Sequence, residues 1–165
     1  MASPFDTLVY GWKDIANAVE WSSPADLEDG HIQFLVPLEI EGITIAEFSL
    51  RGGAYEQHVD KALMFQLEIG SPGVRTRTPL IRIDWQPLNP IHKNPDKVII
   101  SGSHVHPFEA NWLESDQRMR TGNLPVAEKM SEIHTFTDLL DFAKILFRIN
   151  NIDDIPVPEW SPKLI

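Results

Sequence analysis

The sequence predicts an α+β fold: a curved antiparallel sheet of about five strands, with an N-terminal helix and a C-terminal helix packed on it. Between residues 31 and 108, apolar and polar residues alternate at the two-residue period of half-buried strands, with turn signals between the runs. Residues 135–150 instead repeat apolar side chains at helical spacing. Because 165 residues without an internal repeat suit one core, residues 1–165 are expected to form a single domain.

The first element is predicted to be a helix over residues 8–21. Apolar side chains recur there at helical spacing, and the following Ser22-Ser23-Pro24 would end the helix. Residues 26–30 are then expected to form an acidic turn. The apolar positions of the predicted helix are Leu8, Trp12, Ile15 and Val19.

Five segments have strand character. The run 31–40 places its apolar residues on one face, and Glu41-Gly42 suits a two-residue hairpin turn into a second strand over 43–50. Glycines at 52 and 53 are expected to end that strand. The remaining strands are predicted over 62–69, 79–86 and 98–108, with a loop rich in Pro, Asn and Lys over 87–97.

The C-terminal part is predicted to be helical. A short helix is expected over 125–133, and a longer one over 135–150. Thr135 and Asp138 resemble a capping box at the start of the longer helix, with Asp in place of the usual Glu. Its apolar stripe consists of Leu139, Phe142, Ala143, Leu146 and Phe147.

Composition excludes several classes of function. The chain has no cysteine, which rules out disulfides, thiolate metal sites and cysteine nucleophiles. No run approaches the roughly 18 apolar residues of a membrane span, and the first residues lack the pattern of a signal peptide. We therefore expect a cytoplasmic protein that has no membrane partner.

The net charge of −10 is unevenly distributed. Residues 1–73 contain twelve acidic and three basic residues, whereas residues 74–122 contain five acidic and seven basic residues. This asymmetry serves solubility alone, or it separates an acidic face that binds a protein partner from a basic face that binds an anion. Asp26, Glu28 and Asp29 would lie on the acidic face. The overall negative charge disfavours general nucleic-acid binding.

The strongest candidate site is the pair His104 and His106. Residues i and i+2 of a strand point to the same face, so the two imidazoles should project together. Such a pair suits two ligands of a divalent metal ion, or a general acid and a general base. The alternative is a buried hydrogen-bond network without a catalytic role.

A second group of candidates precedes this strand. Arg82 and Asp84 share one face of the predicted strand 79–86, and Asp84 could orient or co-ligate a histidine if the two strands are neighbours. A surface ion pair is the competing explanation for Arg82 and Asp84. Ordinary turn chemistry is the competing explanation for the segment Asn94-Pro95-Asp96. The residues expected to bind an anionic substrate are Arg75, Arg77, Arg82, His92 and Asn94, with Lys93 beside them and Trp112 stacking on a base.

Residues 78–156 resemble a family of small bacterial proteins classed as a domain of unknown function. The family pattern is an R-[LI]-D strand, a P-x-H-x-N-P-D loop and an H-x-H strand, followed by a Trp-bearing loop and F-T-D at a helix. The chain departs from it in Lys97, where the pattern has Gly, in Val105, and in a shortened segment before Trp112. The matching positions are Arg82, Asp84, His92, Asn94, Pro95, His104 and His106.

The resemblance implies a shared patch centred on histidines, and an association with toxin–antitoxin or prophage systems, but no known reaction. The first functional hypothesis is a non-enzymatic binding module of such a system, or of a defence system, with an acidic partner-binding face. The alternative is an enzyme centred on His104, His106 and Asp84. It would be RNase-like or a metal-dependent hydrolase, acting on a nucleotide or RNA. A purely structural domain is the third hypothesis.

Overall fold

The structure is a computed structural model that describes residues 3–22, 30–71 and 73–160. Its helices are α1 (Asp6–Tyr10), α2 (Phe108–Asn111), α3 (Phe136–Phe147) and the 3-10 helix η2 (Ile152–Asp154). Its strands are β1 (Asp14–Ile15), β2 (His31–Ile40), β3 (Ile43–Tyr55), β4 (Leu63–Ile69), β5 (Thr78–Trp85), β6 (Ile91–Lys93), β7 (Ile99–Ser101), β8 (His104–His106), β9 (Trp112–Leu113), β10 (Arg118–Met119) and β11 (Glu128–Lys129).

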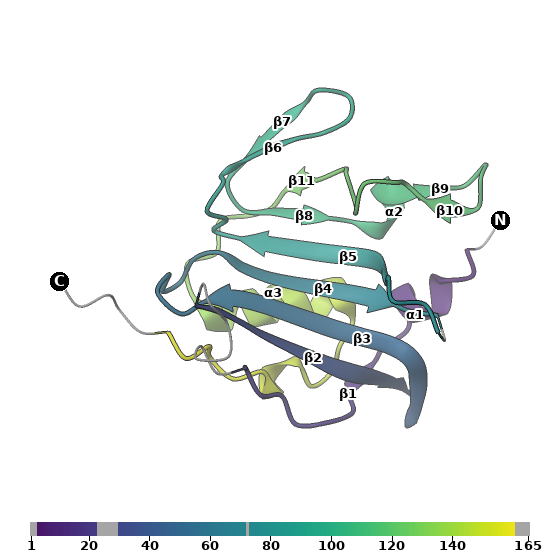
Figure 1. The fold of residues 1–165 in the computed structure, drawn as a ribbon, viewed down its shortest axis with the longest axis horizontal. Coiled ribbons are helices and arrows are strands. Elements are labelled where there is room, and N and C mark those ends of the chain that lie inside the picture. The colour runs from purple at the N-terminus through teal and green to yellow at the C-terminus, as the bar shows by residue number, and fades with distance from the viewer. Residues whose placement is uncertain (1–2, 23–29, 72, 161–165) are drawn as a thin grey trace.

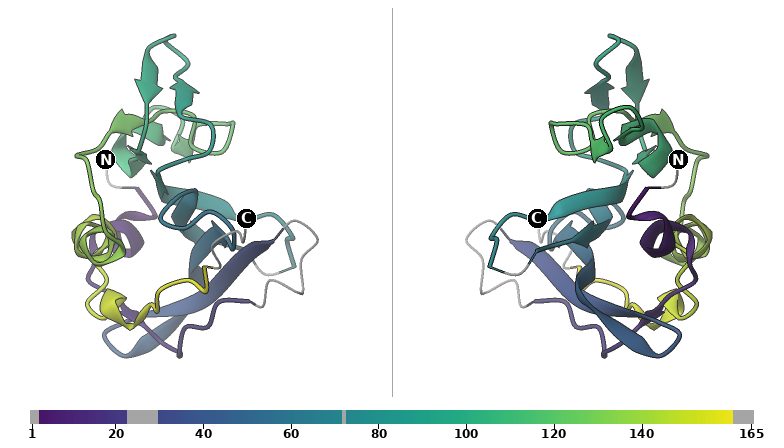
Figure 2. Two further views of the ribbon diagram at one scale, coloured as in Figure 1. Left: turned by 90° about the vertical axis from the view of Figure 1, so that its left-hand side faces the viewer. Right: turned by 90° about the vertical axis from the view of Figure 1, so that its right-hand side faces the viewer.

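The α+β class is confirmed, but the main sheet is larger than predicted. It contains seven strands in the order β1-β2-β3-β4-β5-β8-β11, all antiparallel, rather than about five, and it is not strongly curled. Two short two-stranded sheets, β6–β7 and β9–β10, lie outside it. Helix α3 packs along one face of the main sheet, and the β6–β7 hairpin projects beyond its edge (Figures 1 and 2).

The core lies between α3 and the sheet. Alternate residues of β2 are buried, as their period-two pattern predicts, and they meet the apolar stripe of α3. Thr135 caps that helix, because its side chain accepts a hydrogen bond from the Asp138 amide, which confirms the predicted start. None of the helices in the described part of the chain is long and apolar enough to cross a membrane.

The β2–β3 hairpin is confirmed at its turn. Ile40 pairs with Ile43, and both central residues have positive φ, 52° at Glu41 and 77° at Gly42, as a type I′ turn requires. The predicted end of the second strand at the glycines was wrong, because β3 continues to Tyr55. A Cβ atom on Gly52 would lie 2.1 Å from the Phe34 ring, so this glycine makes room for an aromatic side chain of β2.

The predicted helix over 8–21 was wrong. Helix α1 ends at Tyr10, and the chain then forms β1, which pairs with β2. Contacts with the end of α3 decide this, since the Ile15 amide donates to Asn151 and the Lys13 amide donates to the Arg148 carbonyl. Tertiary hydrogen bonds therefore override the helical spacing. The predicted acidic turn at 26–30, including Asp26, Glu28 and Asp29, falls almost wholly outside the described residues.

Three further predictions were wrong near the site. The strand expected over 98–108 is broken at Gly102, whose φ is 82°, so β7 pairs with β6 while β8 joins the main sheet. The segment 87–97, expected to be a loop, contains β6. The segment expected to form a helix over 125–133 instead contributes β11, which pairs with β8.

Candidate metal centre

Four polar side chains meet on the face of the sheet opposite α3. In the register of the neighbouring strands β5 and β8, Arg82 lies opposite His106 and Asp84 lies opposite His104. The intervening residues, including Ile83 and Val105, are buried in the core. By alternation, both polar pairs therefore face away from the core. The predicted convergence of Asp84, His104 and His106 is confirmed.

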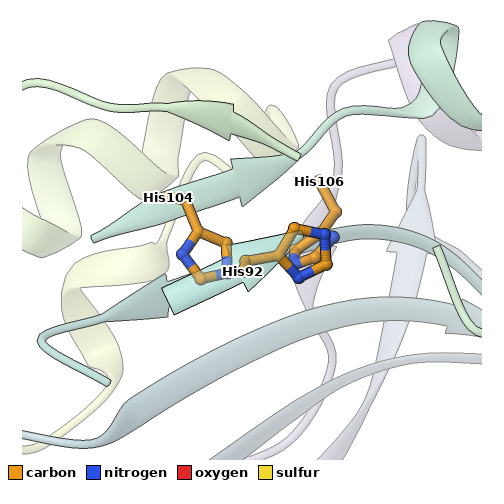
Figure 3. Close-up of side chains that lie close together, drawn as sticks. All are labelled: His92, His104 and His106. Atoms are coloured by element: carbon orange, nitrogen blue, oxygen red, sulfur yellow. The ribbon is translucent and has the colours of Figure 1, made fainter. Parts of the chain in front are cut away.

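His92 joins this group from outside the sheet. It lies on β6, and its ring centroid is 5.3 Å from that of His104 and 5.1 Å from that of His106. One nitrogen of each of the three rings lies within 4.8 Å of one nitrogen of the others. Figure 3 shows the three imidazole rings gathered together. Nitrogens this close need only a small side-chain rotation to reach one metal ion at the usual Zn–N distance of about 2.0–2.1 Å.

Asn94 holds His92 in place and does not line the pocket. The Asn94 side chain is buried, donates to the Ala127 carbonyl at 2.9 Å and accepts from the Ala127 amide at 2.9 Å. This pair of bonds ties the β6–β7 hairpin to the segment before β11. These contacts give Asn94 a structural role, because its buried amide pairs with backbone, and substrate binding by Asn94 stays a prediction.

Each of the three histidines has one ring nitrogen against a backbone carbonyl. The Nδ1 atoms of His104 and His106 lie 2.8 Å and 2.6 Å from the carbonyl oxygens of Gly102 and Leu124. The Nε2 atom of His92 lies 2.9 Å from the Pro125 carbonyl oxygen. Because a carbonyl can only accept, these nitrogens must carry the ring proton. In a neutral ring, the other nitrogen then presents its lone pair, as a metal ligand does.

The carboxylate of Asp84 lies against two of the three imidazole rings. Its Oδ2 lies 3.1 Å from Nε2 of His106 and 3.4 Å from Nε2 of His104. Arg82 donates to both carboxylate oxygens, from Nε at 2.8 Å and from Nη2 at 3.2 Å. This bidentate pair fixes the plane of the carboxylate.

Burial and partners set the charges of these groups. Burial alone would raise the pKa of Asp84, but hydrogen bonds from His104 and His106 and the charge of Arg82 outweigh it and hold the pKa well below its usual range. Burial also opposes charge on both imidazoles. The bond to Asp84 still raises the pKa of His104, whereas burial prevails and lowers the pKa of His106. With the ring proton at Nδ1, each Nε2 atom reaches the ionised oxygen of Asp84 favourably only through a second proton or through a metal cation in its place.

The group opens into a pocket of about 380 Å³. This volume lies within the range of small-molecule sites, roughly 300–1,000 Å³. Its lining consists of Arg82, Asp84, Pro87, Asn89, Ile91, His92, His104, His106, Gly122, Asn123, Leu124 and Pro125.

Three residues predicted to bind substrate lie elsewhere. Arg77 precedes β5 at the end remote from Asp84 and pairs with Glu47 at 3.2 Å and with Glu68 at 3.7 Å. Arg75 also precedes β5 and is exposed. Trp112 stacks on Phe108 instead of facing the pocket. The expected basic patch is therefore not assembled, and Arg82 is the predicted arginine that reaches the site.

The loop at residues 122–125 was missed by sequence reasoning. Asn123 and Leu124 both have φ of 60°, and this left-handed pair turns the Leu124 carbonyl toward His106. The run Gly122-Asn123-Leu124-Pro125 contains three turn-forming residues, a signal that marks a loop but not its role.

Comparison with known proteins gives no relative: no family model, no curated protein and no solved structure matches the chain. The resemblance to the bacterial family therefore stays a prediction.

Proposed function

We propose that the protein is a metal-dependent hydrolase whose divalent metal ion is held by His92, His104 and His106. The observation that carries the proposal is the contact between each imidazole ring and a backbone carbonyl. All three imidazoles have one nitrogen against a backbone carbonyl, and one nitrogen of each ring lies within 4.8 Å of one nitrogen of the others. Ligand histidines in metalloproteins are held in the same way.

The donor set favours a transition metal. Imidazole nitrogens suit Zn²⁺, Fe²⁺, Ni²⁺ or Cu²⁺, whereas Mg²⁺ and Ca²⁺ prefer oxygen ligands. A structural metal site is closed by four protein ligands, but a catalytic site keeps a position open. The open pocket above the three rings supports the catalytic type of site.

Hydrolysis fits the remaining groups. A bound metal ion would act as a Lewis acid and lower the pKa of water. Asp84 stays ionised and lies beside the imidazoles, where it can accept a hydrogen bond from water and orient it, or act as a fourth ligand. In the reaction a water oxygen bonds to the carbon or phosphorus of an ester, the ester oxygen leaves, and the proton given up by water ends on it.

The binding-module hypothesis has less support. It rests on the acidic N-terminal half, and three of the residues expected on its acidic face, Asp26, Glu28 and Asp29, lie outside the described part of the chain. A toxin–antitoxin, prophage or defence setting and a protein partner stay predictions. The geometry around Asp84 favours the enzymatic alternative.

The experiment is metal analysis of the purified protein. We expect about one equivalent of a transition metal per chain after reconstitution with Zn²⁺ or Fe²⁺ and gel filtration. His104→Ala and His106→Ala should lose it, and His92→Ala should weaken it. His134→Ala is the matched control, because His134 is exposed and outside the pocket. Equal metal content in the control and in His104→Ala would refute the metal centre.

A further inference from the structure

A second pocket adjoins the metal centre on the same face of the sheet. Its volume is about 280 Å³, and it shares Arg82, Asp84 and Pro87 with the first pocket. The other residues that line it are His31, Gly53, Tyr55, Ala62, Leu63, Met64 and Leu88.

The two pockets lie along one row of residues that crosses the sheet. Gly53 pairs with Met64, Met64 pairs with Asp84, and Asp84 pairs with His104, on the successive strands β3, β4, β5 and β8. These strands lie side by side in Figure 1. From Met64 to His104 the row covers two strand spacings, about 10 Å. One small molecule can therefore lie in both pockets at once.

The second pocket suits a flat and weakly polar group. The rings of His31 and Tyr55 lie 5.0 Å apart at its side, and the thioether of Met64 forms a polarisable surface. Gly53 keeps the space open, because a Cβ atom there would lie 3.1 Å from Nε2 of His31 and 3.7 Å from Cε of Met64. Aromatic and thioether surfaces bind ring systems by stacking and dispersion.

Arg82 stands where the two pockets meet. Its Nε and Nη2 atoms bond to Asp84, while its Nη1 atom makes no hydrogen bond to any residue that the structure describes. The side chain is 28% exposed, so this edge of the guanidinium can receive an anionic oxygen from the pocket.

We propose that the two pockets together bind a nucleotide, with the base in the second pocket and the phosphate between Arg82 and the three histidines. The inference rests on the proposed function, since the phosphate ester is then the group hydrolysed. A base joined to a phosphate matches the order of the groups along the row, in which the weakly polar second pocket is followed by Arg82 and then by the histidines. A short ligand fits better than a long polyanion, because Arg75 and Arg77 lie away from the site and the net charge is −10.

The test is ligand binding followed by NMR with labelled Met methyl and Tyr ring positions. Adenosine should shift the Tyr55 and Met64 signals with or without Zn²⁺. Adenosine 5′-monophosphate should bind the Zn²⁺-loaded protein at least about tenfold more tightly than ribose 5-phosphate, because only the former offers a base to the second pocket. Gly53→Val and Met64→Ala should remove this difference while the Zn²⁺ content stays unchanged. Leu35→Ala is the matched control, because Leu35 is exposed and lines neither pocket.

The outcomes separate the two proposals. If Zn²⁺ binds but adenosine leaves the Tyr55 and Met64 signals unmoved, or the two phosphates bind equally, the nucleotide inference is overturned and the metal centre stands. If Zn²⁺ does not bind but adenosine shifts those signals and Met64→Ala abolishes the shift, the base subsite stands and the hydrolase proposal fails. Because Met64 is half-buried on the outer face, its truncation tests the pocket even if Gly53→Val does not fold.

Discussion

Asp84 and His106 face each other across neighbouring strands, with Oδ2 of the carboxylate 3.1 Å from Nε2 of the ring. The other ring nitrogen of His106 lies 2.6 Å from the Leu124 carbonyl oxygen. Because that carbonyl fixes the ring proton at Nδ1, Nε2 of a neutral His106 ring carries a lone pair. This lone pair faces the negatively charged oxygen of Asp84. A cation at this point, either a second proton or a metal ion, joins the two groups.

Asp84→Asn tests this relationship. The substitution keeps the shape of the side chain but removes the negative charge that attracts a cation and holds Arg82. We expect metal affinity to fall roughly 10–100-fold, as for other changes beside metal-binding histidines. The measurement is a Zn²⁺ titration against a competing chelator. Asp141→Asn, on the exposed side of α3, is the control, and equal affinities for the two variants would contradict the role of Asp84.

Asn94→Ala tests how His92 is positioned. The change removes both hydrogen bonds to Ala127 and leaves a buried amide and a buried carbonyl without partners. We expect a loss of about 2–4 kcal/mol in the free energy of unfolding. We also expect weaker Zn²⁺ binding, because the β6–β7 hairpin carries His92. Urea unfolding and Zn²⁺ titration measure the two effects, with exposed Asn17→Ala as the control. Unchanged stability would show that the hairpin is held by other contacts.

Lys13→Met tests a buried amino group outside the site. Lys13 is fully buried, and its Nζ atom donates to the carbonyls of Val9, Gly11 and Phe147 at 3.1, 2.7 and 2.6 Å. Methionine fills a similar volume but leaves these carbonyls without their donor. We expect a loss of about 2–4 kcal/mol at pH 8, measured by urea unfolding. Lys61→Met, at an exposed position, should cost much less.

The same variant has a predicted pH dependence. Burial, with a smaller contribution from the charge of Arg148, lowers the pKa of Lys13 from 10.5 to about 7. Between these two values the unfolded chain binds a proton that the folded chain does not, so this group makes stability rise with pH. The stability gap between wild type and Lys13→Met should therefore widen from pH 7 to pH 10. A gap that stays constant over this range would show that Lys13 remains charged in the fold.

Gly42→Val tests the hairpin turn. Gly42 has φ of 77°, a conformation that a β-branched residue adopts only with strain, while a Cβ atom there would meet nothing within 4 Å. The cost is therefore one of backbone conformation, and we expect a loss of about 1 kcal/mol or more. Gly42→Asn should cost less, because Asn tolerates this region. Equal melting temperatures for wild type and Gly42→Val would contradict the turn assignment.

The sequence by itself determined the elements whose pattern is local. Alternation in β2 and the apolar stripe of α3 depend on each segment's own periodicity, and the turn at Gly42 depends on two adjacent residues. The same two-residue alternation predicted that Arg82 and Asp84 share one face of their strand and that His104 and His106 share one face of theirs. Once β5 and β8 are neighbours, these pairs must share a face, because side chains alternate strictly along a strand.

Only the tertiary structure decided which other groups reach the site. His92 arrives because Gly102 breaks the predicted strand and Asn94 ties the β6–β7 hairpin to Ala127, a contact across 33 residues of sequence. Arg77 is basic like Arg82, but it pairs with the buried Glu68 of β4, near the end of β5 that is remote from the site. Charge and residue type are visible in sequence, whereas the partner that satisfies each polar group depends on which distant segments pack together.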